Sequence, residues 1–170
     1  MQLIRTAIRL MLVLATVGGG FAGILAAVNV FWNTNWNSNA DSGRLLGLLW
    51  FGLLMYVVVT TAGLMFVITE RVGRFMMLTL ASMVPWVDLP GVGYQFTSVM
   101  YTAITFGPPR GATRIGAYIE WSAQLGSQYQ FRIGGSPDAN WSLGVNLFAV
   151  LLVLLAWSYR QLTPVTISDS

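Results

Sequence analysis

Side chains that could do acid–base or nucleophilic chemistry are scarce in this chain. It has no Cys, no His and no Lys, and its nine basic residues are all arginines. Six carboxylates are present, spread along the sequence without clustering: Asp41, Glu70, Asp88, Glu120, Asp138 and Asp169. Catalysis requires a tuned acid, base or nucleophile, and metal sites favour His, Cys or grouped carboxylates. We therefore expect no enzyme, and no catalytic or metal-binding residues.

One group of polar residues has a regular spacing: Gln95, Ser98, Thr102 and Thr105. They recur at three, four and three residues, which is the repeat of one helical face. An uncharged polar stripe in a membrane segment must face protein, water or a polar ligand. It predicts either a pore or polar interface, or ordinary hydrogen bonding between helices. Asp88, nearby in the sequence, is the candidate for a carboxylate inside the membrane.

A second regular pattern consists of small residues: Ala15, Gly19, Gly23 and Ala27. They recur every four residues and would share one face of a helix. Because lipid offers no hydrophobic drive for helices to associate, small residues favour packing by letting backbones approach closely. We predict a helix-packing face whose partner is either another helix of this chain or another subunit.

The composition places these patterns in a membrane. The chain is 55% hydrophobic and 9% charged, whereas a soluble domain has about 25% charged residues. A spanning helix needs about 20 mostly apolar residues, and the segments 10–31, 45–69 and 141–160 satisfy this. A cleaved signal peptide is the alternative for the first segment, but its apolar run continues as far as Phe31, which favours an uncut anchor.

The region 75–106 has two interpretations. The turn residues Asp88-Leu89-Pro90-Gly91 divide it into two short apolar arms. It is either one span over 75–93 or a helical hairpin over 75–106. With a cytoplasmic N-terminus, the single span puts five arginines inside and four outside, whereas the hairpin puts seven inside and two outside. The positive-inside rule favours the hairpin, and the shortness of the arms favours the single span.

The segment 107–140 is predicted to lie outside the membrane. Pro108 and Pro109 end the preceding helix. Residues 113–125 have the pattern of an amphipathic helix lying along the membrane surface. Residues 128–133 alternate strictly between polar and apolar side chains, which predicts a short strand.

Together these elements predict an all-α integral membrane protein with a single membrane domain over residues 1–170. The fold would be a bundle of four or five membrane-embedded helices, with the amphipathic surface helix and the short strand in 107–140. The use of Arg without Lys points to a bacterial source, and Arg5 and Arg9 favour a cytoplasmic N-terminus in the inner membrane.

We expect a non-catalytic structural or accessory subunit of a larger membrane assembly. Its partners would be the lipid bilayer and either other membrane subunits or further copies of itself. The alternative is a small oligomeric channel or transporter that uses the polar stripe. Nucleic acid is not expected, because the arginines are scattered rather than clustered. Lipid contact follows from the membrane setting, whereas no residue pattern indicates a pigment or quinone cofactor.

Overall fold

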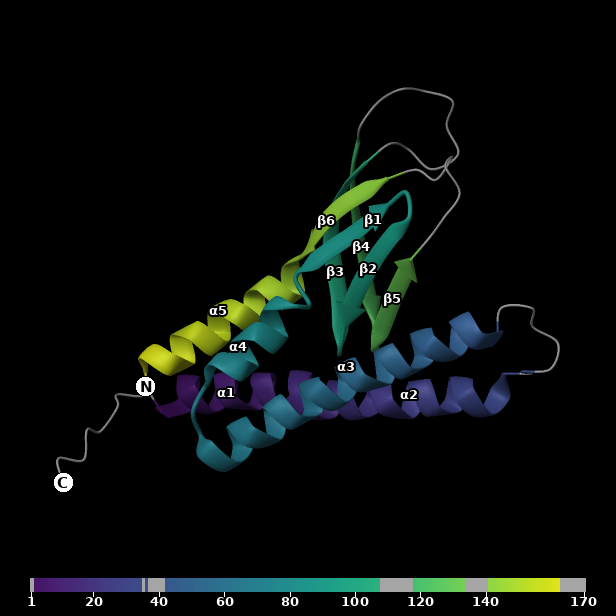
Figure 1. Cartoon of the computed structure of the whole chain (residues 1–170). Coiled ribbons are helices and arrows are strands. Elements are labelled where there is room, and N and C mark those ends of the chain that lie inside the picture. The colour runs from purple at the N-terminus through teal and green to yellow at the C-terminus, as the bar shows by residue number, and fades with distance from the viewer. Residues whose placement is uncertain (1, 35, 37–41, 108–117, 134–140, 163–170) are drawn as a thin grey trace.

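The computed structural model describes residues 2–34, 36, 42–107, 118–133 and 141–162. These residues form four helices and a six-stranded sheet (Figure 1). The first helix is continuous and comprises α1 (Gln2–Val13), the π-helical segment η1 (Leu14–Gly18) and α2 (Gly19–Asn33). The other helices are α3 (Ser42–Thr69), α4 (Arg74–Ala81) and α5 (Leu147–Gln161). The strands are β1 (Pro85–Leu89), β2 (Val92–Thr97), β3 (Met100–Gly107), β4 (Tyr118–Leu125), β5 (Gln128–Ile133) and β6 (Ser142–Asn146).

The first helix and α3 pack side by side as a helix hairpin (Figure 1). Glycines allow the close approach: Gly20 and Gly23 of the first helix face α3, and Gly63 of α3 faces the first helix. A Cβ atom at Gly23 would overlap the buried ring of Tyr56. Many large apolar side chains of both helices, Leu25 among them, are exposed instead. The two helices therefore associate through small residues, as helices do in lipid.

An apolar core lies where α1, α3, α4 and α5 meet. Each helix contributes a large side chain that is 1% exposed or less: Leu12, Phe66, Leu80 and Leu152. α5 ends beside the start of α1, where the guanidinium carbon of Arg5 lies 5.4 Å from the centre of the Tyr159 ring. The described ends of the chain thus lie at the same end of the molecule (Figure 1).

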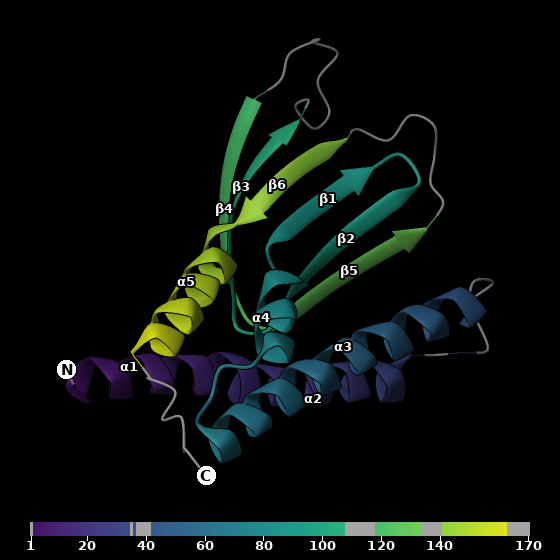
Figure 2. The same ribbon diagram turned by 60° about the vertical axis from the view of Figure 1, so that its left-hand side comes forward.

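Every pair of neighbouring strands in the sheet is antiparallel, in the order β4-β3-β6-β1-β2-β5 (Figure 2). The longest pair, β3 with β4, has a register that begins at Met100 opposite Leu125. The turn Leu89-Pro90-Gly91-Val92 joins β1 to β2, and Gly91 has φ +89°. Such a φ suits the glycine that follows Pro in a type II turn.

The sheet must curl strongly. β4 and β5 form its two edges, and five spacings of about 4.8 Å would separate them by about 24 Å in a flat sheet. Only Gly126 and Ser127 connect β4 to β5, and such a link spans about 10 Å. Ser98 and Val99 likewise connect β2 to β3, which are not neighbours. The edges therefore converge at these four residues, which we name the sheet tip, and the sheet forms a half-barrel.

The two faces of this half-barrel differ in polarity. The strand register places an almost wholly apolar set on the outer face: Pro85, Val87, Leu89, Val92, Tyr94, Phe96, Met100, Thr102, Ile104, Phe106, Ile119, Trp121, Ala123, Leu125, Tyr129, Phe131, Leu143 and Val145. The inner face is mostly polar or small: Trp86, Asp88, Gly93, Gln95, Thr97, Tyr101, Ala103, Thr105, Gly107, Ser122, Gln124, Gln128, Gln130, Ser142 and Gly144.

Contacts between side chains identify the inner face as the concave one. The ring centres of Trp86 on β1 and Tyr101 on β3 are 4.9 Å apart, although β6 lies between these strands. Two strand spacings amount to about 9.6 Å, so the side chains converge above β6. Gly144, which pairs with Trp86, has no side chain to obstruct them.

This sheet overturns the predicted all-α bundle. Residues 75–106 form neither a single span nor a helical hairpin, because α4 ends at Ala81 and three strands follow. The predicted surface helix over 113–125 is also wrong: β4 occupies residues 118–125, and 108–117 lie outside the described residues. The segment 141–160 is divided between β6 and α5. The predicted strand over 128–133 is present as β5.

The physical reason for this difference is the period of the sequence. In residues 92–97, Val, Tyr and Phe alternate with Gly, Gln and Thr, and a period of two is that of a strand with two unlike faces. The predicted spans 10–31 and 45–69 lie within long helices. Helix Gln2–Asn33 and residues Leu45–Thr69 of α3 are both long and apolar enough to cross a membrane.

Candidate functional site

The sheet tip is bound to the first helix at its π-helical segment. Ser98 Oγ donates a hydrogen bond to the Ala15 carbonyl oxygen at 2.6 Å. Ser127 Oγ lies 2.8 Å from the Gly19 carbonyl oxygen and also contacts the Ser98 carbonyl oxygen, so two acceptors share its one proton. π-Helical turns are uncommon and often mark functional positions. Here the Ala15 carbonyl group of the segment and the Gly19 carbonyl group just after it accept from the hydroxyls that attach the half-barrel.

The four residues of the predicted helix-packing face are buried: Ala15, Gly19, Gly23 and Ala27. A Cβ atom at Gly19 would overlap the Ser98 carbonyl oxygen and the Val99 side chain. One at Gly23 would overlap the Tyr56 ring. These glycines thus contact α3 and the sheet tip of the same chain.

The four residues of the predicted polar stripe lie in different surroundings. Ser98 belongs to the sheet tip. Gln95 lies on the inner face, where its Nε2 is 3.4 Å from Gln128 Oε1. Thr102 and Thr105 are three residues apart on β3 and therefore point to opposite faces. The stripe does not form one continuous surface, because its helical spacing falls on strands.

Asp88 lies on the inner face of the half-barrel. It is opposite Gly93 of β2 and Ser142 of β6, and it is partly buried. The turn after it joins strands rather than helices. Within the described residues, no group of three or more carboxylates that could hold a metal ion is found.

A charged pair lies at the end of the molecule that holds the two described termini. Glu70 directly follows α3 with φ 53°, and its Oε1 lies 2.7 Å from Arg9 Nη1. Both side chains are more than a third exposed, and solvent-exposed pairs of this kind contribute little to stability. The pair joins the end of α3 to α1.

A groove of about 340 Å³ opens between α2 and the sheet. We name it the amide groove and define it by Ala26 and Val30 of α2 and by Gln95, Gln128, Tyr129 and Gln130 of the sheet. None of the described residues that line it is charged. Burial raises the pKa of Tyr129, so its phenol remains a neutral hydrogen-bonding group. The groove thus offers amides and a hydroxyl beside an apolar helix wall.

One part of the outer face is covered by the helix hairpin. The rings of Phe131 and Phe51 stack with centres 4.6 Å apart. The ring of Tyr56 lies 5.1 Å from Phe96 and 6.0 Å from Tyr129. Aromatic contacts with α3 therefore cover the outer face of β2 and β5 at Phe96, Tyr129 and Phe131. Beside them, Tyr94 donates a hydrogen bond to the Ser82 carbonyl oxygen at 2.7 Å.

The other part of the same face is exposed. Six large apolar side chains there are 42–72% exposed, and we name them the uncovered patch: Ile104, Phe106, Ile119, Trp121, Leu143 and Val145. They form two rows across three strands, since Ile104 lies opposite both Trp121 and Val145, and Phe106 opposite both Ile119 and Leu143. A contiguous apolar surface of this kind marks contact with a protein or with lipid.

No protein family, curated protein or solved structure matches this chain.

Sequence reasoning missed the uncovered patch and most of the amide groove. The patch had a signal, because residues 119–125 and 141–145 alternate apolar with polar or small side chains in the period of a strand. No sequence pattern indicated the amide groove. Its walls come from residues 26–30, 95 and 128–130, which only the folded chain brings together.

Proposed function

We propose that this protein is a non-catalytic subunit of a larger membrane assembly. The helix hairpin anchors it in the bilayer, and the uncovered patch binds an apolar helix of a partner subunit. The observation that carries this proposal is the unequal covering of one apolar sheet face.

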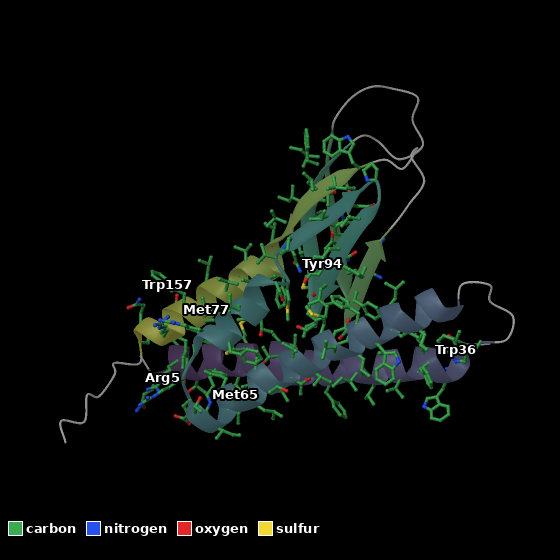
Figure 3. All side chains as sticks on the ribbon, viewed as in Figure 1. Arg5, Trp36, Met65, Met77, Tyr94 and Trp157 are labelled. Atoms are coloured by element: carbon green, nitrogen blue, oxygen red, sulfur yellow. The ribbon has the colours of Figure 1, made fainter. Side chains whose placement is uncertain are left out.

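The membrane setting is supported by two helices with the length and composition of spans, Gln2–Asn33 and Leu45–Thr69. Only 39% and 33% of their most apolar windows are buried within the protein, whereas the core helix of a soluble protein is mostly buried. Trp36 lies at one end of the hairpin, and Arg5 and Trp157 lie towards the other (Figure 3). Tryptophan and arginine at both ends are typical of interfacial anchors.

The orientation in this proposal follows from the arginines. Five of them lie at the start of α1, after α3, at the start of α4 and near the end of α5: Arg5, Arg9, Arg71, Arg74 and Arg160. Since cytoplasmic segments carry an excess of Lys and Arg, this end is assigned to the cytoplasmic side of a bacterial inner membrane.

The packing of α3 on the sheet indicates the chemistry of the partner. That helix covers β2 and β5 with aromatic side chains, while the uncovered patch continues the same apolar face over β4, β3 and β6. None of the six patch residues carries a hydrogen-bonding or charged group except the indole N–H of Trp121. A polar partner would have to desolvate its own groups without compensation. An apolar helix, packed as α3 packs, fits this surface.

The test compares two exposed tryptophans. Trp121 is 68% exposed within the uncovered patch, and Trp32 is 77% exposed on α2. Tryptophan anchors at interfaces contribute about 2 kcal/mol or more, so Trp121→Ala should weaken the complex about 30-fold and release the protein in native electrophoresis of solubilised membranes. Trp32→Ala should leave the complex intact. A wild-type protein that migrates alone, or equal effects of both variants, contradicts the proposal.

The alternative of a small oligomeric channel or transporter would have to use the inner face instead of the predicted stripe. That face is polar and mostly uncharged in its described part, and it includes Gln95 and Thr105. Flux of small polar solutes into liposomes that contain the pure protein tests this alternative.

A further inference from the structure

The amide groove has the size of a ligand site. Its volume of about 340 Å³ lies within the range of small-molecule pockets, about 300–1,000 Å³. A second pocket of about 240 Å³ lies between α2 and α3, and Ala27 lines both. Phe31, Trp50 and Leu53 make this second pocket apolar. Beside its amides the groove has an apolar wall, formed by Ala26 and by Val30, which is 47% exposed. This combination suits a molecule with a polar head and an apolar chain.

The hydrogen-bonding groups of the groove define the head. Gln95 Nε2 donates to Gln128 Oε1 at 3.4 Å. Among the described residues, this contact leaves the Gln95 carbonyl oxygen as an acceptor and the Gln128 amide group as a donor. Gln130 is exposed at the rim of the groove, and its side-chain amide offers both a hydrogen-bond donor and an acceptor. A ligand that fills the groove must therefore both donate and accept hydrogen bonds, because each unpaired buried group costs about 1–3 kcal/mol.

The absence of charge among the described residues of the groove narrows the class of headgroup further. No Arg or Lys lines the groove among the described residues, so a phosphate head would be desolvated without a counter-charge, which is strongly unfavourable. A quinone head only accepts hydrogen bonds and would leave the Gln95 carbonyl oxygen unpaired. Hydroxyl groups, which donate and accept, match the amides.

The level of the groove matches that of lipid headgroups. Ala26 lies seven residues before the end of α2 at Asn33, which is about 10 Å along the helix axis. Trp32 and Trp50 line the neighbouring apolar pocket, and they are 77% and 60% exposed. Tryptophan side chains of membrane proteins gather at the headgroup level.

We propose that the amide groove binds a membrane lipid whose headgroup is neutral and rich in hydroxyls, as in a glycosyl diacylglycerol. The amides and Tyr129 hold the headgroup, and the apolar wall of Ala26 and Val30 receives the first part of an acyl chain. This inference rests on the membrane setting of the proposed function, and it is independent of the partner at the uncovered patch.

The experiment measures lipid binding by native mass spectrometry of the whole protein, released from a polyoxyethylene detergent. The probes are monoglucosyl diacylglycerol, phosphatidylglycerol with the same acyl chains, and ubiquinone-2. The expected result is at least a 10-fold preference for the glucosyl lipid over both others. Equal binding of the glucosyl lipid and phosphatidylglycerol, or a preference for the quinone, overturns the proposal.

Two variants of α2 locate the site. Ala26 and Ala22 are both exposed and lie one helical turn apart, but only Ala26 lines the groove. Ala26→Trp fills the groove and should reduce glucosyl lipid binding at least 10-fold, whereas Ala22→Trp should not change it. Gln130→Leu should abolish the preference for the glucosyl lipid while leaving the melting temperature unchanged. Unaltered binding by Ala26→Trp overturns the site.

Failure of this proposal is distinguishable from failure of the proposed function. Selective lipid binding together with an intact complex in Trp121→Ala refutes only the partner surface. Loss of the complex in Trp121→Ala, with no headgroup selectivity, refutes only the lipid site.

Discussion

The attachment of the half-barrel to the first helix predicts a large effect of one methyl group at Gly19. An added Cβ atom there would overlap the Ser98 carbonyl oxygen and the Val99 side chain, and it would lie 2.7 Å from the Ser98 carbonyl carbon. Backbone atoms of the sheet tip cannot rotate away from it. In Gly19→Ala, we expect the tip to be displaced from the helix, with loss of the Ser98–Ala15 and Ser127–Gly19 hydrogen bonds.

The magnitude follows from three terms. Overpacking costs about 1–3 kcal/mol, and each of the two hydrogen bonds contributes about 0.5–1.5 kcal/mol. Alanine is favoured over glycine in a helix by about 1 kcal/mol, which acts in the opposite direction. Gly19→Ala should therefore lower the free energy of unfolding by about 3 kcal/mol, within a range of about 1–5 kcal/mol.

The neighbouring glycine provides the matched control. A Cβ atom at Gly18 meets no atom within 4 Å, so Gly18→Ala should keep or raise the stability by up to about 1 kcal/mol. Both variants are unfolded by urea in detergent micelles and followed by tryptophan fluorescence. Equal stability of Gly19→Ala and Gly18→Ala would refute the contact between the sheet tip and the helix.

Three further predictions concern other parts of the chain. Asn146 caps α5 and accepts a hydrogen bond from the β3 backbone, so Asn146→Ala should destabilise the protein by about 3 kcal/mol in the same urea titration. Burial raises the pKa of Tyr94 above its ordinary value of 10.0. The contribution of its neutral phenol to the free energy of unfolding is therefore constant below pH 10 and is lost as pH rises above that value. Tyr94→Phe should reduce this alkaline loss of stability. A membrane-impermeant thiol reagent should label Gln2→Cys and Gln161→Cys from the same side and Gly43→Cys from the other; joint labelling of the last two contradicts the arrangement of the helices.

The long helices and one turn could be predicted from the sequence. An uncharged apolar run such as 45–69 has few alternatives to a helix, because its length exceeds that of almost any strand. Pro90-Gly91 was predicted as a turn, and Gly91 has the φ that such a turn requires. The helical arms predicted on either side of this turn are wrong, because the turn joins the strands β1 and β2. The arms are short and uncharged, and their length does not distinguish helices from strands.

The polar residues of β2 and β3 increased the ambiguity. Gln95, Ser98, Thr102 and Thr105 have helical spacing only because the two-residue connection at Ser98 and Val99 interrupts the alternation. On either side of it, the period of two is preserved: Gly93, Gln95 and Thr97 share the inner face. A test of each short segment for alternation would have favoured strands.

The closure of the sheet and the candidate sites could not be predicted from one sequence. Ser98 binds a carbonyl group 83 residues away, and Ser127 binds one 108 residues away. No local propensity encodes such partners, because they depend on the strand order and on the curl of the sheet. The amide groove is assembled in the same way, from α2, β2 and β5.

The most direct test of the central claim is photo-crosslinking in native membranes from two positions on β4. A benzoylphenylalanine at Trp121 lies in the uncovered patch, and one at Gln124 lies on the inner face; both native side chains are exposed. We predict a single adduct of defined mass from position 121, which maps by peptide sequencing to an apolar helix of another protein, and no such adduct from position 124. Adducts only with lipid at position 121, or the same protein adduct from both positions, would contradict it.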